Sequence, residues 1–106
     1  MISFQDFKKT ELKVAEVVSV VDHPNADKLL LIRVKIGDDE RQIVAGLRGH
    51  YQAADLEGKK IVMVTNLEPA VLRGEKSEGM LLAAQDGGSV VILVPEREVA
   101  SGSPVL

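Results

Sequence analysis

The chain has 106 residues, no cysteine, and a formal net charge of −3 from 13 basic and 16 acidic side chains. This length is ordinary for one domain with its own core, so we expect a single domain over residues 1–106. The lack of thiols excludes disulfides, thiolate metal sites and a cysteine nucleophile, which is compatible with a cytoplasmic location. The acidic balance excludes general coating of nucleic acid, so a polyanion must be bound through local patches.

The N-terminal stretch mixes acidic and basic side chains and holds no apolar run of signal-peptide length, so we expect neither export nor membrane insertion. Residues 12–21 are rich in valine with irregular alternation, typical of a strand buried on both faces at one end. Residues 30–37 alternate strictly, which predicts a second strand with one apolar face. A polar stretch, residues 37–41, predicts a hairpin loop of moderate length before a third strand over 41–46. Together these strands predict a meander.

The second half predicts one short helix and three strands, in the order helix 47–58, strand 59–67, loop 68–79, strand 80–85 and strand 89–95. We expect Gly58 to cap the C-terminal end of the helix. Three strands, a helix and two strands is the order of the all-β OB-fold, a five-stranded Greek-key barrel, with its core over about residues 10–86. Residues 89–106 are a C-terminal strand extension beyond that barrel. They either cover the barrel of their own chain or pair with a second copy.

Catalytic and metal sites find little support. The stretch GEKSEG brings a lysine and a serine together as a phosphate-binding loop does, but Glu75 separates Gly74 from Lys76. His23 and His50 are the only imidazoles, and neither has the spacing of a zinc ligand set. We therefore expect no enzyme, no metal and no cofactor.

The turn HPNADK at residues 23–28 has a full structural explanation, because Pro24 restricts His23 and the Asn and Asp side chains can bond their own backbone. It also opens a run of four cations with few acids between them: Lys28, Arg33, Lys35 and Arg41. Hairpin pairing is expected to bring the last of these near the outer face that carries the two before it. The alternative to a purely structural turn is thus a cationic surface patch that binds phosphates.

A second polar loop competes for the same role. Residues 66–80 carry Asn66, Arg73, Lys76 and Ser77 between two strands, and loops at a barrel mouth are where OB-folds bind. An ordinary crossover with Pro69 and Gly74 as turn formers is the alternative.

Aromatic side chains are scarce, since Phe4, Phe7 and Tyr51 are the whole supply. Proteins that bind single strands stack successive bases on aromatic platforms, which this chain cannot build at length. The scarcity favours a structured RNA read through its shape, phosphates and 2′-hydroxyls.

The motifs HPNADKL, NLEPAVLRG and SEGMLLAA, in this order, resemble the tRNA-binding domain at the C-terminus of many methionyl-tRNA synthetases, which also occurs as a free-standing tRNA-binding protein. The resemblance covers nearly the whole chain. It implies an OB-fold with a C-terminal extension, homodimerisation through that extension, and non-catalytic binding of tRNA at the outer corner of the L. A partner aminoacyl-tRNA synthetase is implied as well.

The resemblance also implies a set of contacts to tRNA: Asn25, Lys28, Arg41, Asn66, Arg73, Ser77 and Met80. The three cations are expected to contact phosphates, the two asparagines and the serine to hydrogen-bond, and the methionine to pack near the RNA. A related family of dimeric OB-fold export chaperones gives the alternative function, polypeptide binding. An exposed apolar groove in place of a basic one would distinguish it.

Overall fold

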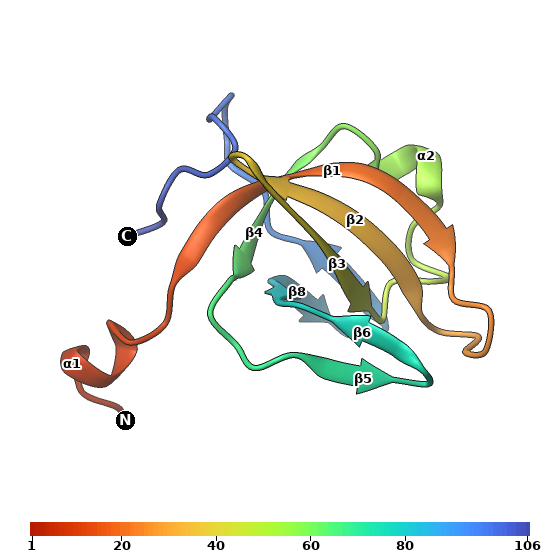
Figure 1. Ribbon diagram of the computed structural model, residues 1–106, viewed down its shortest axis with the longest axis horizontal. Coiled ribbons are helices and arrows are strands. Elements are labelled where there is room, and N and C mark those ends of the chain that lie inside the picture. The colour runs from red at the N-terminus through yellow and green to blue at the C-terminus, as the bar shows by residue number, and fades with distance from the viewer.

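A five-stranded antiparallel sheet, curled into a barrel, is the centre of the computed structural model, which describes residues 1–106 (Figure 1). Its strands are β1 (Leu12–Asp22), β2 (Leu30–Ile36), β3 (Asp39–Ala45), β4 (Lys60–Val64) and β7 (Met80–Leu81). They pair in the order β3-β2-β1-β4-β7, so β3 and β7 are the edges. Just before β7, the backbone N–H of Glu78 donates to the carbonyl of Gln42 on β3, at 2.9 Å, and links the two edges. The predicted meander and OB-fold are confirmed.

The long strand β1 serves two neighbours, pairing with β2 over its second half and β4 over its first. Its register shifts between Val17 and Ser19, which marks a bulge. A bulge bends a strand and breaks its two-residue period, which accounts for the irregular alternation of this stretch. Val14 and Ala15 are both buried at the other end of the strand, as the sequence predicts.

The core lies inside the barrel and is built from alternate residues of the strands. On β2 the four apolar residues Leu30, Ile32, Val34 and Ile36 are all buried, and the residues between them face outward. Burying one such side chain contributes about 1.5–3 kcal/mol, so strict alternation fixes which face turns inward. Ile92, from the C-terminal extension, also belongs to this core.

The turn between β2 and β3 is tighter than predicted. Ile36 pairs directly with Asp39, so only Gly37 and Asp38 form the loop, with Gly37 at φ 63°. Two-residue hairpins need positive φ, which glycine adopts without steric cost. The remaining polar residues of this stretch already belong to β3.

The other elements are short: α1 (Phe4–Phe7), α2 (Ala53–Leu56), β5 (Ala70–Leu72), β6 (Glu75–Ser77), β8 (Ala83–Asp86) and β9 (Ser89–Ile92). The helix predicted over 47–58 is wrong in length, because Gly49 at φ 92° interrupts it and only one turn forms. Gly58, at φ 87°, follows its C-cap and ends it as expected. No helix of the chain is long and apolar enough to cross a membrane.

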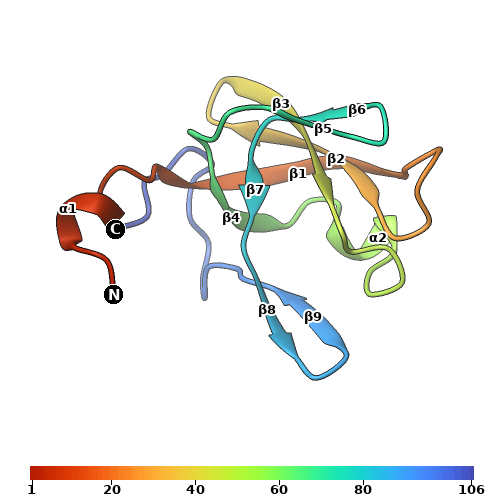
Figure 2. The same ribbon diagram turned by 90° about the horizontal axis from the view of Figure 1, so that it is seen from below.

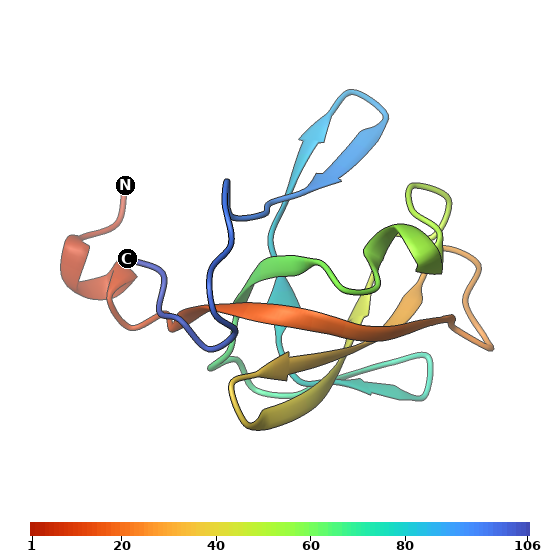
Figure 3. The same cartoon turned by 90° about the horizontal axis from the view of Figure 1, so that it is seen from above.

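Two hairpins replace predicted simpler elements. The loop expected over 68–79 contains the β5–β6 hairpin, which lies beside β3. The strand expected over 80–85 is broken, since β7 stays in the barrel while β8 leaves it and pairs with β9. Figures 2 and 3 show the β8–β9 hairpin standing off the barrel.

The C-terminal tail, residues 98–106, returns to its own barrel. The backbone N–H of Val14 donates to Ser103 O and that of Val105 to Leu12 O, each at 2.9 Å. The hydroxyl of Ser101 accepts from Gly37 N–H and donates to Lys35 O, which secures the β2–β3 turn. Of the two alternatives for the extension, the tail thus follows the first, whereas no strand of the barrel pairs with the β8–β9 hairpin.

Candidate nucleic-acid interface

Two loops distant in sequence meet at one end of the barrel, where the β1–β2 connection lies beside the tip of the β5–β6 hairpin (Figures 1 and 2). Lys28 and Arg73 line one hollow there of about 400 Å³, together with Ala26, Asp27 and Leu29. Both cationic side chains are exposed and form no ion pair within the chain. The structure therefore brings together two of the three predicted phosphate contacts.

Asn25 belongs to the same place. Its side chain is exposed on the β1–β2 loop, while its backbone N–H donates to Nδ1 of His23 at 2.9 Å. Two free cations and a free amide on adjoining loops are the groups that contact phosphates and 2′-hydroxyls. We refer to Asn25, Lys28 and Arg73 as the two-loop site.

Two residues that hold this site were not predicted to do so. His23 is buried, and its Nε2 lies 2.9 Å from the carbonyl oxygen of Leu72 on β5. Arg48 donates from Nη1 to Ala26 O at 3.2 Å, and its Nη2 lies 3.3 Å from Oδ2 of Asp22. Sequence patterns could not reveal either role, since folding brings Arg48 to all of its partners and His23 to Leu72.

Arg73 holds an unusual backbone conformation. It has φ 52°, and the following Gly74 has φ 89°. Leu72 pairs with Glu75, so these two residues form a two-residue hairpin turn with positive φ at both positions, as in type I′. A non-glycine residue in the left-handed region costs roughly 1–2 kcal/mol, and asparagine tolerates it best. Arginine is thus a poor choice for the turn, which favours a role for its side chain.

Replacing Arg73 with asparagine is expected to stabilise the protein while weakening RNA binding. Asn-Gly is the preferred type I′ sequence, so the free energy of unfolding should rise by about 0.5–1 kcal/mol in urea denaturation. The control is Lys76→Asn on the neighbouring strand, where asparagine is disfavoured and no gain is expected. A loss of stability at Arg73→Asn would contradict this account of the turn.

Arg41 lies apart from the two-loop site, and the expectation about its face is wrong. It pairs with the buried Val34, whereas Arg33 pairs with Gln42, so Arg41 lies on the opposite face from Arg33 and Lys35. Residues directly opposite in a ladder share a face, and the two-residue turn sets this pairing. Its Nη1 donates to Thr65 O at 2.5 Å and to Glu78 O at 3.4 Å, across the closure of the barrel.

The outer face of β2 carries less free charge than the sequence indicates. Arg33 Nε donates to Oε1 of Glu40 at 3.1 Å, so one of its two cations is paired on the surface. Lys35 is exposed and has no ion-pair partner. A continuous cationic patch from Lys28 to Arg41 therefore does not form.

Asn66 joins the N-terminal segment to the end of β4. Its Oδ1 accepts from Glu11 N–H at 2.8 Å and its Nδ2 donates to Lys9 O at 2.7 Å. Next to it, Thr65 Oγ1 donates to the Glu11 carboxylate at 2.6 Å. This hydrogen bond, with the charge of Lys13, lowers the pKa of Glu11 below its ordinary value. The predicted RNA contact at Asn66 stays a prediction, with its amide already engaged within the chain.

Ser77 and Met80 lie away from the two-loop site as well. The hydroxyl of Ser77 is buried, accepts from Val44 N–H at 2.9 Å and donates to Gly79 O at 3.1 Å. It attaches the β5–β6 hairpin to β3. Met80 is exposed on β7 beside an apolar groove. Contacts of these two residues with RNA stay predictions.

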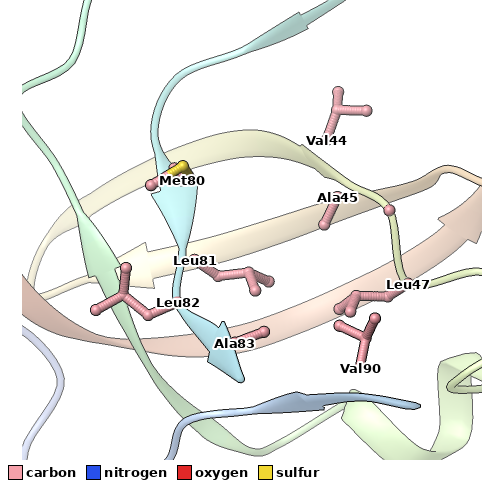
Figure 4. Close-up of a pocket in the computed structure, with 9 residues that line it drawn as sticks. Val44, Ala45, Leu47, Met80, Leu81, Leu82, Ala83 and Val90 are labelled. Atoms are coloured by element: carbon pink, nitrogen blue, oxygen red, sulfur yellow. The ribbon is translucent and has the colours of Figure 1, made fainter. Parts of the chain in front are cut away.

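The apolar groove has a volume of about 360 Å³ and is lined by residues 44–47, residues 80–83 and Val90. Figure 4 shows Leu47, Leu81 and Val90 turned toward one another across it. It lies between the end of β3, strand β7 and the β8–β9 hairpin. Nothing in it is charged, so it suits an apolar surface rather than a phosphate.

No cluster of three or more His, Cys, Asp or Glu side chains lies close enough to hold a metal ion. His23, the one buried imidazole, has both ring nitrogens engaged with the backbone.

The amino-acid sequence matches a known protein family and several known proteins. The model of the family described as "Putative tRNA binding domain" matches residues 12–104. The methionine–tRNA ligase of Thermococcus onnurineus is 48% identical over 104 residues, which is 98% of this chain and 14% of the ligase. That of Methanococcus aeolicus is 49% identical over 105 residues, 99% of this chain and 16% of the ligase. The chain thus spans about a seventh of the length of these enzymes.

Solved structures agree in fold over the whole chain. A protein described as related to methionyl-tRNA synthetase, from Pyrococcus horikoshii, superposes with a TM-score of 0.93 at 33% identity, covering 100% of this chain and 98% of that one. The chaperone CsaA of Bacillus anthracis superposes with a TM-score of 0.90 at 29% identity, covering 100% and 99%.

Proposed function

The chain belongs to the family of tRNA-binding domains, and from that premise we propose that it binds folded tRNA at the outer corner of the L, without catalysis, in the cytoplasm. It acts either as a free tRNA-binding protein or beside an aminoacyl-tRNA synthetase, with methionyl-tRNA synthetase as the first candidate. A weak site of this kind becomes useful when tethered, because it raises the local concentration of RNA.

The observation that carries this proposal is the two-loop site. It presents two unpaired cations and an amide on two loops that meet at one end of the barrel. No aromatic side chain lines the hollow that Lys28 and Arg73 share. Phosphate and 2′-hydroxyl contacts at fixed spacing discriminate shape, whereas stacking discriminates unpaired bases.

The test is a gel shift with purified tRNA across a salt series. We expect several unrelated tRNAs to bind equally, affinity to fall as salt rises, and RNA unfolded by heat to bind poorly. Equal affinity for single-stranded poly-U would overturn the proposal, because that RNA has no corner to recognise.

We further propose that the protein is a homodimer joined through the β8–β9 hairpin. The hairpin stands off the barrel, so both of its edges lack a partner strand, and Val91, Leu93 and Val94 are exposed on it or just after it. The apolar groove adjoins the hairpin through Val90. A second copy of the hairpin laid on this surface would cover both features.

Replacing Val91 and Val94 with glutamate is expected to give monomers, since two buried carboxylates per chain cannot be accommodated without partners. The matched control is Val18→Glu with Val21→Glu, two valines of similar exposure on β1. Sedimentation should show twice 11.4 kDa for the wild type and the control, and 11.4 kDa for the hairpin variant. A dimer that persists in the hairpin variant would place the interface elsewhere.

Where no second copy covers it, the apolar groove favours a second candidate, binding of unfolded polypeptide, in line with the likeness to chaperone CsaA. Ribonuclease treatment distinguishes tRNA binding from polypeptide binding. Proteins that co-purify through bound RNA are released by digestion, and those held in the groove are retained.

A further inference from the structure

The imidazole of His23 contacts both halves of the two-loop site. It follows β1 directly, with only 2% of its surface exposed. Nδ1 accepts from the backbone N–H of Asn25, so the ring hydrogen lies on Nε2, which donates to Leu72 O at 2.9 Å. Asn25 belongs to the first loop, and Leu72 immediately precedes Arg73 in the second.

This bond is the only hydrogen bond between the β1–β2 connection and the β5–β6 hairpin. The hairpin is also attached to β3 along strand β6. The side chain of Gln42 donates to Glu75 Oε1 at 3.2 Å and to Lys76 O at 2.9 Å, and Ser77 Oγ accepts from β3 at 2.9 Å. A two-stranded hairpin is marginally stable by itself in water. Without His23, no hydrogen bond joins the tip that carries Arg73 to the loop that carries Lys28.

A fixed distance matters for the kind of ligand proposed above. Phosphates of a folded RNA have set spacings, so two loops that are already held together bind with a smaller ordering cost than two loops that move independently. If the tip moves freely, affinity falls in proportion to the population that holds the binding arrangement.

We infer that His23 is a positioning residue, which holds the two loops as one RNA-binding surface through its bond to the carbonyl of Leu72. The inference rests on the proposed function, because it assigns His23 to that same site. It touches no RNA itself, being covered by the two segments that it joins.

Two isosteric substitutions separate its two hydrogen bonds. The amide nitrogen of glutamine reaches the position of Nε2, so His23→Gln keeps the bond to Leu72 and removes the one to Asn25. The side-chain oxygen of asparagine reaches the position of Nδ1, so His23→Asn keeps the bond to Asn25 and removes the one to Leu72. Each variant is the control for the other, since each removes one bond of the same kind.

His23→Asn is expected to weaken tRNA binding about threefold to tenfold, and His23→Gln to retain it. Equal affinities of the two variants, or a weaker His23→Gln, would overturn the inference. Each variant is compared at a temperature where denaturation shows it fully folded, so that a loss of stability alone does not lower affinity.

A double-mutant cycle tests the positioning role itself. In the wild type, Lys28→Ala and Arg73→Ala should be coupled, so that their joint effect on affinity differs about fivefold from the product of the single effects. In the His23→Asn background, the joint effect of the two substitutions on affinity should equal the product of their single effects. Coupling that survives this substitution would show that His23 does not position the site.

NMR measurements on the free protein test the role of His23 without depending on RNA binding. NMR relaxation of the free protein should show ordered amides at Arg73 and Gly74 in the wild type and His23→Gln, and order parameters below about 0.6 in His23→Asn. An ordered tip in His23→Asn refutes the positioning role. A failure of the wild type to bind any tRNA refutes the proposed function alone.

Discussion

Reversing the charge of both Lys28 and Arg73 is expected to lower the affinity for tRNA about 100-fold, at about tenfold for each phosphate interaction that is removed. The slope of log affinity against log salt concentration should fall by about 2, because two fewer counterions are displaced. The free energy of unfolding should not change, since both side chains are exposed and unpaired. Gel shifts across a salt series and urea denaturation measure the two quantities.

Lys59→Glu with Arg97→Glu is the matched control. These cations line a different hollow, and the substitution changes the net charge by the same amount. Equal decreases in affinity in the two double variants would mean that only the overall charge matters. That result would remove the two-loop site from the proposal.

Removing the guanidinium of Arg41 is expected to destabilise the barrel by about 2–3 kcal/mol, as measured by urea denaturation of Arg41→Met. The methionine keeps the apolar stem, but leaves the carbonyls of Thr65 and Glu78 without their charged donor. These bonds lie where β3 meets the chain before β7, so their removal weakens the closure of the barrel. Any decrease in RNA binding should follow the unfolded fraction.

Arg33→Met on the neighbouring strand is the control. Arg33 pairs with a carboxylate at the surface, where such a pair contributes about 0.2–1 kcal/mol. If Arg41→Met kept full stability and lowered the salt dependence of tRNA binding by the equivalent of one phosphate, Arg41 would bind RNA directly, as the family resemblance implies.

The barrel was predictable because burial imposes a two-residue period. The strict alternation of β2 is enough to identify its core face, and the valine-rich irregularity of β1 marks the bulge that the structure shows. The family motifs then indicate the same fold for nearly the whole chain. The sequence does not predict the lengths of loops. It also does not predict elements without apolar periodicity, which are α1, the one-turn α2 and the β5–β6 hairpin. That hairpin turns at Arg73 and Gly74, which lacks the usual Asn-Gly signal.

The candidate site was only partly accessible from sequence. The face of Arg41 depends on whether two or three residues form the β2–β3 turn, since a shift of one residue moves the side chain to the other face. Lys28 and Arg73 were each predicted from their own loops, but nothing in the sequence shows that a buried histidine joins them. Histidine hydrogen bonds to backbone carbonyls leave no periodic pattern, so His23 read as a turn residue.

The return of the C-terminal tail to β1 has a practical consequence for protein engineering. Because Val105 pairs with Leu12, the two chain ends lie on the same side of the barrel, and the two-loop site lies on the other (Figure 1). Domains with adjacent ends tolerate insertion and circular permutation. The domain should therefore accept a host protein at either end, or be spliced into a surface loop of one, with its basic loops still directed outward.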